Sequence, residues 1–269
     1  MCYSNFYPSS GMFHASLPLL MGTRLDVLLF GFDKNMLENV WKDMKMEFIR
    51  LEKMFNRFNP DSEVAKINND AQFSDVRLSD ELWEIMLDCR RYYEKTDGFF
   101  DVTCTNFNNM VLMENTHHIL FERHGMFLDF GGYAKGYALK CVRKKIEEAG
   151  IKVALINFGN SSVLALGAHP FGDSWTIQID HLSLTNRQSP IRLYDNSLSV
   201  SGNTVARKAH IVNPKTAEYI TGNRMAAVVA DDPLDAEVLT TAWIASGCEF
   251  TPDWMSDFMI DFKTSFIIT

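Results

Sequence analysis

The stretch LDFGGYAKGYALK, from Leu128 to Lys140, combines three glycines, two tyrosines and two lysines at one predicted junction. We expect a short hydrophobic strand to lead into Gly131-Gly132, and a helix to follow. Glycine lets a backbone approach a ligand closely, and a helix N-terminus offers free N–H groups in a positive potential. Lys135 adds a full positive charge. The stretch therefore predicts a binding site for an anion such as a phosphate.

The composition limits the classes of partner. The chain has 269 residues, of which 46% are hydrophobic and 22% charged, and its formal net charge is -8. Proteins that bind nucleic acid usually carry a basic patch, so we expect no nucleic-acid partner. A phosphorylated ligand stays compatible, because a local site can be positive on an acidic protein.

Cysteine usage and hydropathy bear on the compartment. The five cysteines are widely spaced and form no C-x-x-C pair, which argues against a disulfide scaffold or a zinc site. No segment is long and apolar enough to span a membrane, and MCYSNFYPSS lacks the regions of a signal peptide. We expect a cytoplasmic protein. The alternative is a periplasmic or lipid-anchored protein, if Cys2 is the processed cysteine of a lipoprotein.

Hydrophobic spacing predicts helices and short strands in irregular alternation. Long helices are expected at residues 34–56, 79–95, 134–149 and 233–246, and a loop with a short helix is expected at 56–68. Strands are expected at 25–32, 152–159, 174–180, 197–202, 209–214 and 225–231, with a hairpin at 258–269. This order favours an α+β fold, a mixed α/β sandwich. We expect one domain over residues 1–269, with two intertwined subdomains as the alternative.

Six short stretches occur in the order typical of one family. They are MGT (21–23), FNRFNPDSEVAKIN (55–68), TDGFFDVT (96–103), LDFGGYAKGYAL (128–139), SGNTVARKAHIVNPKTAEYI (201–220) and AEVLTTA (236–242). Each stretch alone is a weak signal. Because all six appear in sequence order, the chain resembles the ApbE family, the FAD:protein FMN transferases.

The resemblance implies a fold of the ApbE type and a reaction. Members break the pyrophosphate of FAD, attach FMN through its phosphate to a Thr or Ser of an acceptor protein, and release AMP. They use a divalent cation, usually Mg²⁺. The acceptor is expected to be a flavoprotein subunit of a redox complex, so the resemblance also implies peripheral membrane association through that acceptor.

The resemblance assigns roles to individual residues. Catalytic roles fall to His210, Glu237 and Thr241, with His210 as a base or an orienting group. The metal ligands are Glu237, Thr241 and the backbone carbonyl of Ala134. Glu237 and Thr241 are four residues apart on a predicted helix, so they face the same way and offer hard oxygen ligands. The FAD site comprises Met21, Gly22, Thr23, Phe58, Asp97, Gly98, Asp101, Gly131, Gly132, Lys135 and His210.

Several of these residues also have an ordinary structural interpretation, which the sequence leaves open. Phe58 is expected to stack on the flavin, yet an aromatic residue often belongs to the core. In structural terms, Gly131-Gly132 would be a tight turn, Lys135 a solvated side chain, Asp97 and Asp101 caps, and Thr241 a helix residue bonded to its own backbone.

Some positions depart from the family pattern. Glu237 stands where the family has Asp, and Asp235 lies nearby at a spacing that turns it away from Thr241. Lys140 replaces an Asp, FGNSS at 158–162 replaces a Gly-Gly-Asp element, and Asn213 and Ala217 replace Asp and Gly. A flavin-binding protein without transferase activity is therefore the alternative function. An unrelated α/β hydrolase or nucleotide binder is a third hypothesis, but its sequence motifs are missing.

Overall fold

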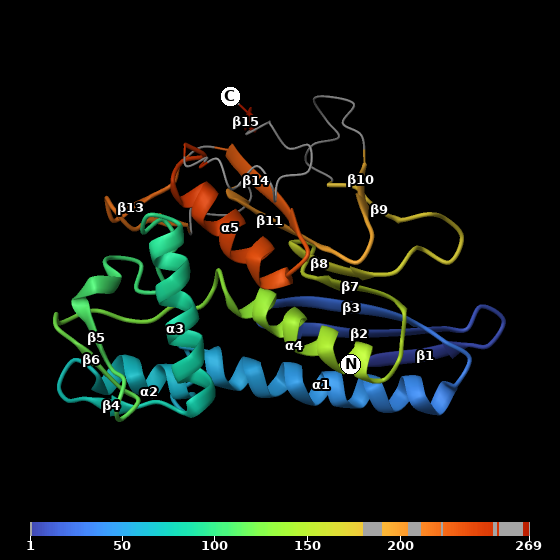
Figure 1. Cartoon of the computed structure of the whole chain (residues 1–269), viewed down its shortest axis with the longest axis horizontal. Coiled ribbons are helices and arrows are strands. Elements are labelled where there is room, and N and C mark those ends of the chain that lie inside the picture. The colour runs from blue at the N-terminus through green and yellow to red at the C-terminus, as the bar shows by residue number, and fades with distance from the viewer. Residues whose placement is uncertain are drawn as a thin grey trace.

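A central antiparallel sheet organises the chain. The computed structural model describes residues 2–179, 190–203, 211–221, 223–249, 252 and 266–268. Within them, eight strands run in the order β1-β2-β3-β7-β8-β11-β14-β15 (Figure 1). Their bounds are Tyr3–Tyr7, Met12–Leu20, Thr23–Phe30, Val153–Phe158, Ser162–Leu166, Ser197–Asn203, Asn223–Ala230 and Phe266–Ile268.

Three helices pack on one face of this sheet (Figure 1). They are α1 (Lys34–Phe55), α4 (Ala134–Glu148) and α5 (Pro233–Ala245). On β3, Leu25, Val27 and Leu29 are fully buried in the core that these helices share. The alternate residues of β3 point to the opposite face, because successive side chains of a strand point to opposite sides. There a smaller cluster forms around Trp175 of β9 (Trp175–Ile177) and Leu193 of β10 (Ile191–Leu193).

A second group of elements lies beyond one end of the sheet (Figure 1). It contains α2 (Glu63–Asp70), α3 (Asp80–Lys95) and a small sheet in the order β4-β6-β5. These three strands span Val76–Arg77, His118–Phe121 and Met110–Met113, and a 3₁₀ turn covers Phe107–Asn109. The hairpin of β12 (Val212–Asn213) and β13 (Glu218–Tyr219) completes the described elements.

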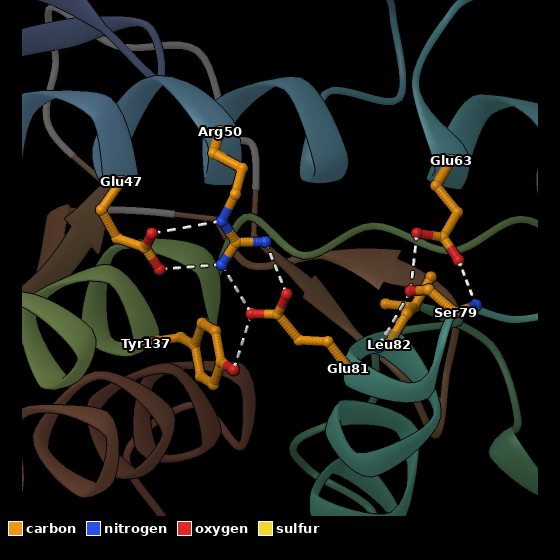
Figure 2. A network of polar contacts seen from close by, with 7 residues as sticks. All are labelled: Glu47, Arg50, Glu63, Ser79, Glu81, Leu82 and Tyr137. Carbon is orange, nitrogen blue, oxygen red and sulfur yellow. Dashed lines mark hydrogen bonds and ion pairs between the residues drawn. The ribbon is translucent and has the colours of Figure 1, made fainter.

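A polar network fastens the second group to the helical layer (Figure 2). Arg50 of α1 donates to Glu47 of its own helix and, at 2.5 and 2.8 Å, to both carboxylate oxygens of Glu81 on α3. Tyr137 of α4 donates to Glu81 at 3.1 Å. Ser79 caps α3 by accepting from the Leu82 N–H, as its sequence position predicted. Three helices are therefore tied together at the Glu81 carboxylate.

The predicted α+β class is confirmed, and the four expected long helices and the expected short helix, α2, are all present. The sequence pattern missed the N-terminal hairpin of β1 and β2. Most of the expected hairpin at 258–269 lies outside the described residues, but residues 266–268 pair with β14. In the part of the chain that the structure describes, no helix has the length and apolarity needed to cross a bilayer.

Candidate functional site

A cavity of about 1120 Å³ lies where the N-terminal end of α4, helix α5 and several turns of the main sheet meet. This volume slightly exceeds the usual range for small-molecule sites, and it therefore suits a large ligand. Nine of the residues that the sequence assigned to a site line its wall. They are Met21, Gly22, Thr23, Asp101, Gly131, Gly132, Lys135, Glu237 and Thr241.

The β2–β3 turn forms one side of the cavity. Met21 and Gly22 both have positive φ values, of 47° and 76°, as a two-residue hairpin turn requires. Glu52 of α1 fixes the turn by accepting from the Met21 N–H at 2.7 Å. Thr23 packs on Gly159, where an added Cβ would lie 2.5 Å from its hydroxyl oxygen. A glycine at 159 therefore lets the β2–β3 turn and the β7–β8 turn approach each other closely.

The loop before α4 is not the strand that the sequence predicted. Leu128 and Phe130 are buried, but their backbone joins none of the sheets of the described residues. The side chain of Asn68 instead satisfies both backbone groups of Leu128, at 2.7 and 3.0 Å. Asp129 donates its N–H to Val102 O. A side-chain amide thus replaces the hydrogen bonds of a ladder and leaves the loop free to curve around the cavity.

The N-terminus of α4 is suited to an anion. Its N-cap residue, Tyr133, makes no side-chain capping bond, although the Gly131 N–H already donates to Asp129 Oδ1 and the Ala134 N–H to Phe130 O. Gly131, Gly132 and Lys135 bring this helix start to the cavity wall. Backbone donors, the helix dipole and an ammonium group are therefore combined at one place.

Glu237 is the most enclosed charge in the cavity wall, with only 2% of its surface exposed. Its Oε1 pairs with the Lys135 ammonium of α4. Its Oε2 accepts hydrogen bonds from Ser162 of β8 at 2.5 Å and Ser199 of β11 at 2.9 Å. A buried carboxylate needs such partners, because desolvation without them is costly. The charge is therefore compensated from the helix and from the sheet.

Thr241 lies one helical turn after Glu237 and also lines the cavity. Its hydroxyl donates to Glu237 O at 2.9 Å, which is the ordinary bond of a helical threonine, and its lone pairs remain able to accept or to coordinate. A Cβ at Gly132 would lie 2.7 Å from the Thr241 methyl. Close packing against Thr241 therefore requires a glycine at position 132, whether or not a ligand binds there. Ala134 is buried behind this contact and is not among the wall residues.

The TDGFFDVT stretch forms the C-terminal end of α3 and the loop after it. Asp97 and Gly98 have φ values of 51° and 76°, and Gly98 N–H bonds to Tyr93 O at 2.7 Å, as in a Schellman motif. Lys215 donates to Asp97 at 2.6 Å. Neither Asp97 nor Gly98 is a wall residue.

Asp101 does line the cavity, yet it also has a structural role. Its carboxylate accepts from the N–H and hydroxyl of Thr103, each at 2.7 Å, and from the Phe107 N–H at 3.0 Å. Burial raises the pKa of Asp101 above its ordinary value, while these hydrogen bonds oppose the shift. The cap interpretation and a cofactor role are thus compatible at this residue.

Three further candidates lie away from the cavity wall or cannot be placed. Phe58 is 80% exposed and is not a wall residue, although its ring lies 4.4 Å from the guanidinium of Arg57, which is one. His210 lies outside the described residues. Asp235 accepts from the Tyr92 hydroxyl at 2.6 Å and does not line the cavity.

Two departures from the family pattern have local structural roles. Lys140 of α4 forms an ion pair with Asp232, the N-cap of α5, at 2.6 Å. Asn213 accepts from the Lys215 N–H at 2.9 Å within the β12–β13 turn, where Ala217 has a φ of 57°. Lys140 and Asn213 therefore each make a local polar contact in this chain.

Several residues at the site were missed by sequence reasoning. Arg57 and Asp129 line the cavity and form an ion pair with an Nε–Oδ2 distance of 3.0 Å. Asn68 ends the second quoted stretch, so its position was a signal that could have been followed. Ser162 ends the FGNSS stretch that departs from the family pattern, but nothing in the sequence pointed to its contact with Glu237. Ser199 gave no signal, because isolated serines in strands are common.

Residues of these motifs line one cavity. Comparison with known proteins supports the family that the motifs predicted. The model of the ApbE family matches residues 21–111 and 104–262. The chain belongs to the ApbE family. Two curated ApbE relatives are named FAD:protein FMN transferase. That of Klebsiella pneumoniae is 27% identical over 184 residues, covering 62% of this chain and 54% of the relative. That of Chlamydia muridarum is 23% identical over 219 residues, covering 65% and 64%.

Solved ApbE structures share the fold. A mutant of the flavin transferase ApbE from Vibrio cholerae superposes with a TM-score of 0.75 at 18% identity, over 88% of this chain and 87% of the other. The ApbE protein from Thermotoga maritima gives 0.74 at 19% identity, over 95% and 89%. At such identities the likeness establishes the fold. The chain spans less than two thirds of the length of the two curated relatives above.

Proposed function

We propose that this ApbE chain, acting as a single domain, transfers FMN from FAD to a Thr or Ser hydroxyl of an acceptor protein and releases AMP. The observation that carries the proposal is the convergence of the six family stretches on one large cavity, to whose wall each contributes at least one residue. This wall combines the uncapped N-terminus of α4 with Lys135, which suits a pyrophosphate. The name of the curated relatives supports the same reaction.

The proposed reaction exchanges one phosphorus–oxygen bond for another. The acceptor hydroxyl oxygen bonds to the FMN phosphorus, the bond from that phosphorus to the bridging oxygen breaks, and AMP leaves with that oxygen. Lys135 would bind phosphate oxygens, and the positive end of the α4 dipole would help to stabilise the charge that develops on them. His210 stays the predicted base or orienting group.

A divalent cation is compatible with the donors at the cavity. Glu237 and Thr241 supply hard oxygen atoms on one helical turn, which Mg²⁺ prefers. No cluster of three or more His, Cys, Asp or Glu residues that suits a metal occurs among the described residues. Ala134 O, water and the phosphates would therefore complete the shell. When bound, the ion would neutralise charge on the pyrophosphate. Lys135 would have to share or yield Glu237 Oε1.

The alternative function is FAD binding without transfer. One observation favours it: both oxygens of Glu237 already have partners, in Lys135, Ser162 and Ser199. In that case the ion pair would persist in the presence of FAD and Mg²⁺. FAD would bind, and no AMP would be formed.

Mass spectrometry of a candidate acceptor tests the proposal. The purified chain is incubated with FAD, Mg²⁺ and a flavoprotein subunit of a redox complex, and a mass gain of one FMN with equal AMP release is expected. Glu237→Gln keeps the side-chain shape and removes the charge, so transfer should fall at least about a hundredfold and recover partly at high Mg²⁺. Asp235→Asn, on the same helix and away from the cavity, is the matched control. FAD binding without AMP or mass gain would support the alternative.

A further inference from the structure

We infer that Ser162 and Ser199 are positioning residues that hold the Glu237 carboxylate and make a glutamate workable at this position. The inference rests on the proposed function, because it concerns how the carboxylate is presented to the ligand. Neither serine lines the cavity, so neither is a contact for FAD. Both lie behind the wall, with 2% and 1% of their surfaces exposed.

The two serines occupy a matched position in the sheet. Ser162 begins β8 and Ser199 lies in β11, and they are direct cross-strand partners. Directly opposed side chains on one face of a sheet lie about 4.5–5.5 Å apart, so one acceptor between them can bond to both. Glu237 Oε2 is that acceptor, at 2.5 and 2.9 Å. Oε2 is thereby directed to the sheet, and Oε1 is left for Lys135 or another cation.

The length of the glutamate side chain explains why Glu237 and its two serine donors belong together. Gly136 of α4 leaves room for the Glu237 Cβ, since a Cβ on Gly136 would lie 2.6 Å from it. An aspartate at 237 would end one methylene earlier, about 1.5 Å short of the present carboxylate. Its oxygens would then lie outside hydrogen-bond distance of both hydroxyls. The family's usual residue should therefore not be interchangeable with glutamate in this chain.

The test is a set of serine variants made in two backgrounds. Ser162→Ala and Ser199→Ala should each lower kcat for FMN transfer about tenfold, with KM for FAD changed less than twofold, because each removes a hydrogen bond to a charged group. In the Glu237→Asp background, the same substitutions should have less than a twofold effect. Binding of Mn²⁺ without FAD, followed by electron paramagnetic resonance, should show the same pattern in its dissociation constant.

Ser197→Ala is the matched control. Ser197 is equally buried on β11, and its hydroxyl has no hydrogen-bond partner among the described residues, so its removal should be neutral. Equal serine effects in both backgrounds, or none in either, would overturn the inference. If Glu237→Asp does not fold, Glu237→Ala replaces it, because alanine offers no acceptor to either serine, and the serine effects should again shrink. If the unsubstituted protein transfers no FMN but binds Mn²⁺, the proposed function is refuted. The Mn²⁺ dissociation constants of the serine variants then test the inference on their own. A parent that does neither overturns both.

Discussion

A buried ion pair, Lys135–Glu237, dominates the energetics of the site at the scale of single residues. The side chains are 19% and 3% exposed, so water screens the pair weakly. Removing one partner of a buried pair leaves an uncompensated charge, which is more harmful than removing both. The pair thus makes stability and ligand binding depend on the same two side chains.

Lys135→Met should therefore lower the free energy of unfolding by about 3 kcal/mol, measured by urea denaturation without ligand. Adding Glu237→Gln to it should restore part of that loss, because the stranded charge disappears. If the double variant is less stable than Lys135→Met by the full effect of Glu237→Gln alone, the two residues are energetically independent.

Arg57 and Phe58 are adjacent in the chain but differ in their access to the cavity. Arg57 lines it, whereas Phe58 is 80% exposed. We expect Arg57→Ala to weaken FAD binding about tenfold, the usual effect of losing one charge-assisted hydrogen bond. Phe58→Ala should weaken it less. A fluorescence titration in which Phe58→Ala causes the larger loss would place Phe58 at the flavin after all.

At the scale of elements, α4 and α5 approach each other closely at a glycine. A Cβ on Gly136 would lie 2.6 Å from Glu237 Cβ and 2.8 Å from Pro233 O. Alanine is favoured over glycine inside a helix by about 1 kcal/mol, but a backbone clash of this kind costs more. We expect Gly136→Ala to lower the unfolding free energy by about 1–3 kcal/mol. Lys144→Ala, on the exposed face of α4, is the control and should be neutral within about 0.5 kcal/mol.

The Arg50 network joins α1, α3 and α4, and it predicts a pH dependence. Hydrogen bonding to Arg50 lowers the pKa of Glu81 below its ordinary value of 4.5. A depressed carboxylate pKa stabilises the folded state above the ordinary value, and this stabilisation is lost as the pH falls through the folded pKa. Glu81→Gln should cost about 1 kcal/mol at pH 7, and the difference from the parent should shrink as the pH falls below the ordinary value and through the lowered pKa of Glu81. Glu84→Gln, exposed on α3, is the control and should change the unfolding free energy at pH 7 by less than about 0.5 kcal/mol.

For the whole molecule, sequence reasoning succeeded where the signal was local. Helix periodicity and the caps at Ser79 and Gly150 depend on neighbours within a few residues, and these helices were found. The order of short motifs identified the family and most of the cavity wall. The 23–30 strand was likewise visible in its own alternation.

The errors concern features that depend on distant partners. The LDF segment has the composition of a strand, but Asn68, sixty residues earlier, takes its backbone bonds. The β1–β2 hairpin carries few signals besides Gly11. Ser162 and Ser199 acquire their role only when two strands pair and α5 covers them. Such residues are found from geometry and not from spacing.

The separation of the site residues along the chain has a consequence for folding kinetics. Glu237 meets partners that lie 38, 75 and 102 residues earlier. Each contact closes a long loop, and the entropy of that closure has to be overcome before the contact gives any stabilisation. The carboxylate should therefore gain its partners late in refolding, after α1 and the β2–β3 hairpin have formed from near neighbours. A chain emerging from the ribosome would carry Lys135, Ser162 and Ser199 unpaired until α5 is synthesised, so competence to bind would arise in a single late step.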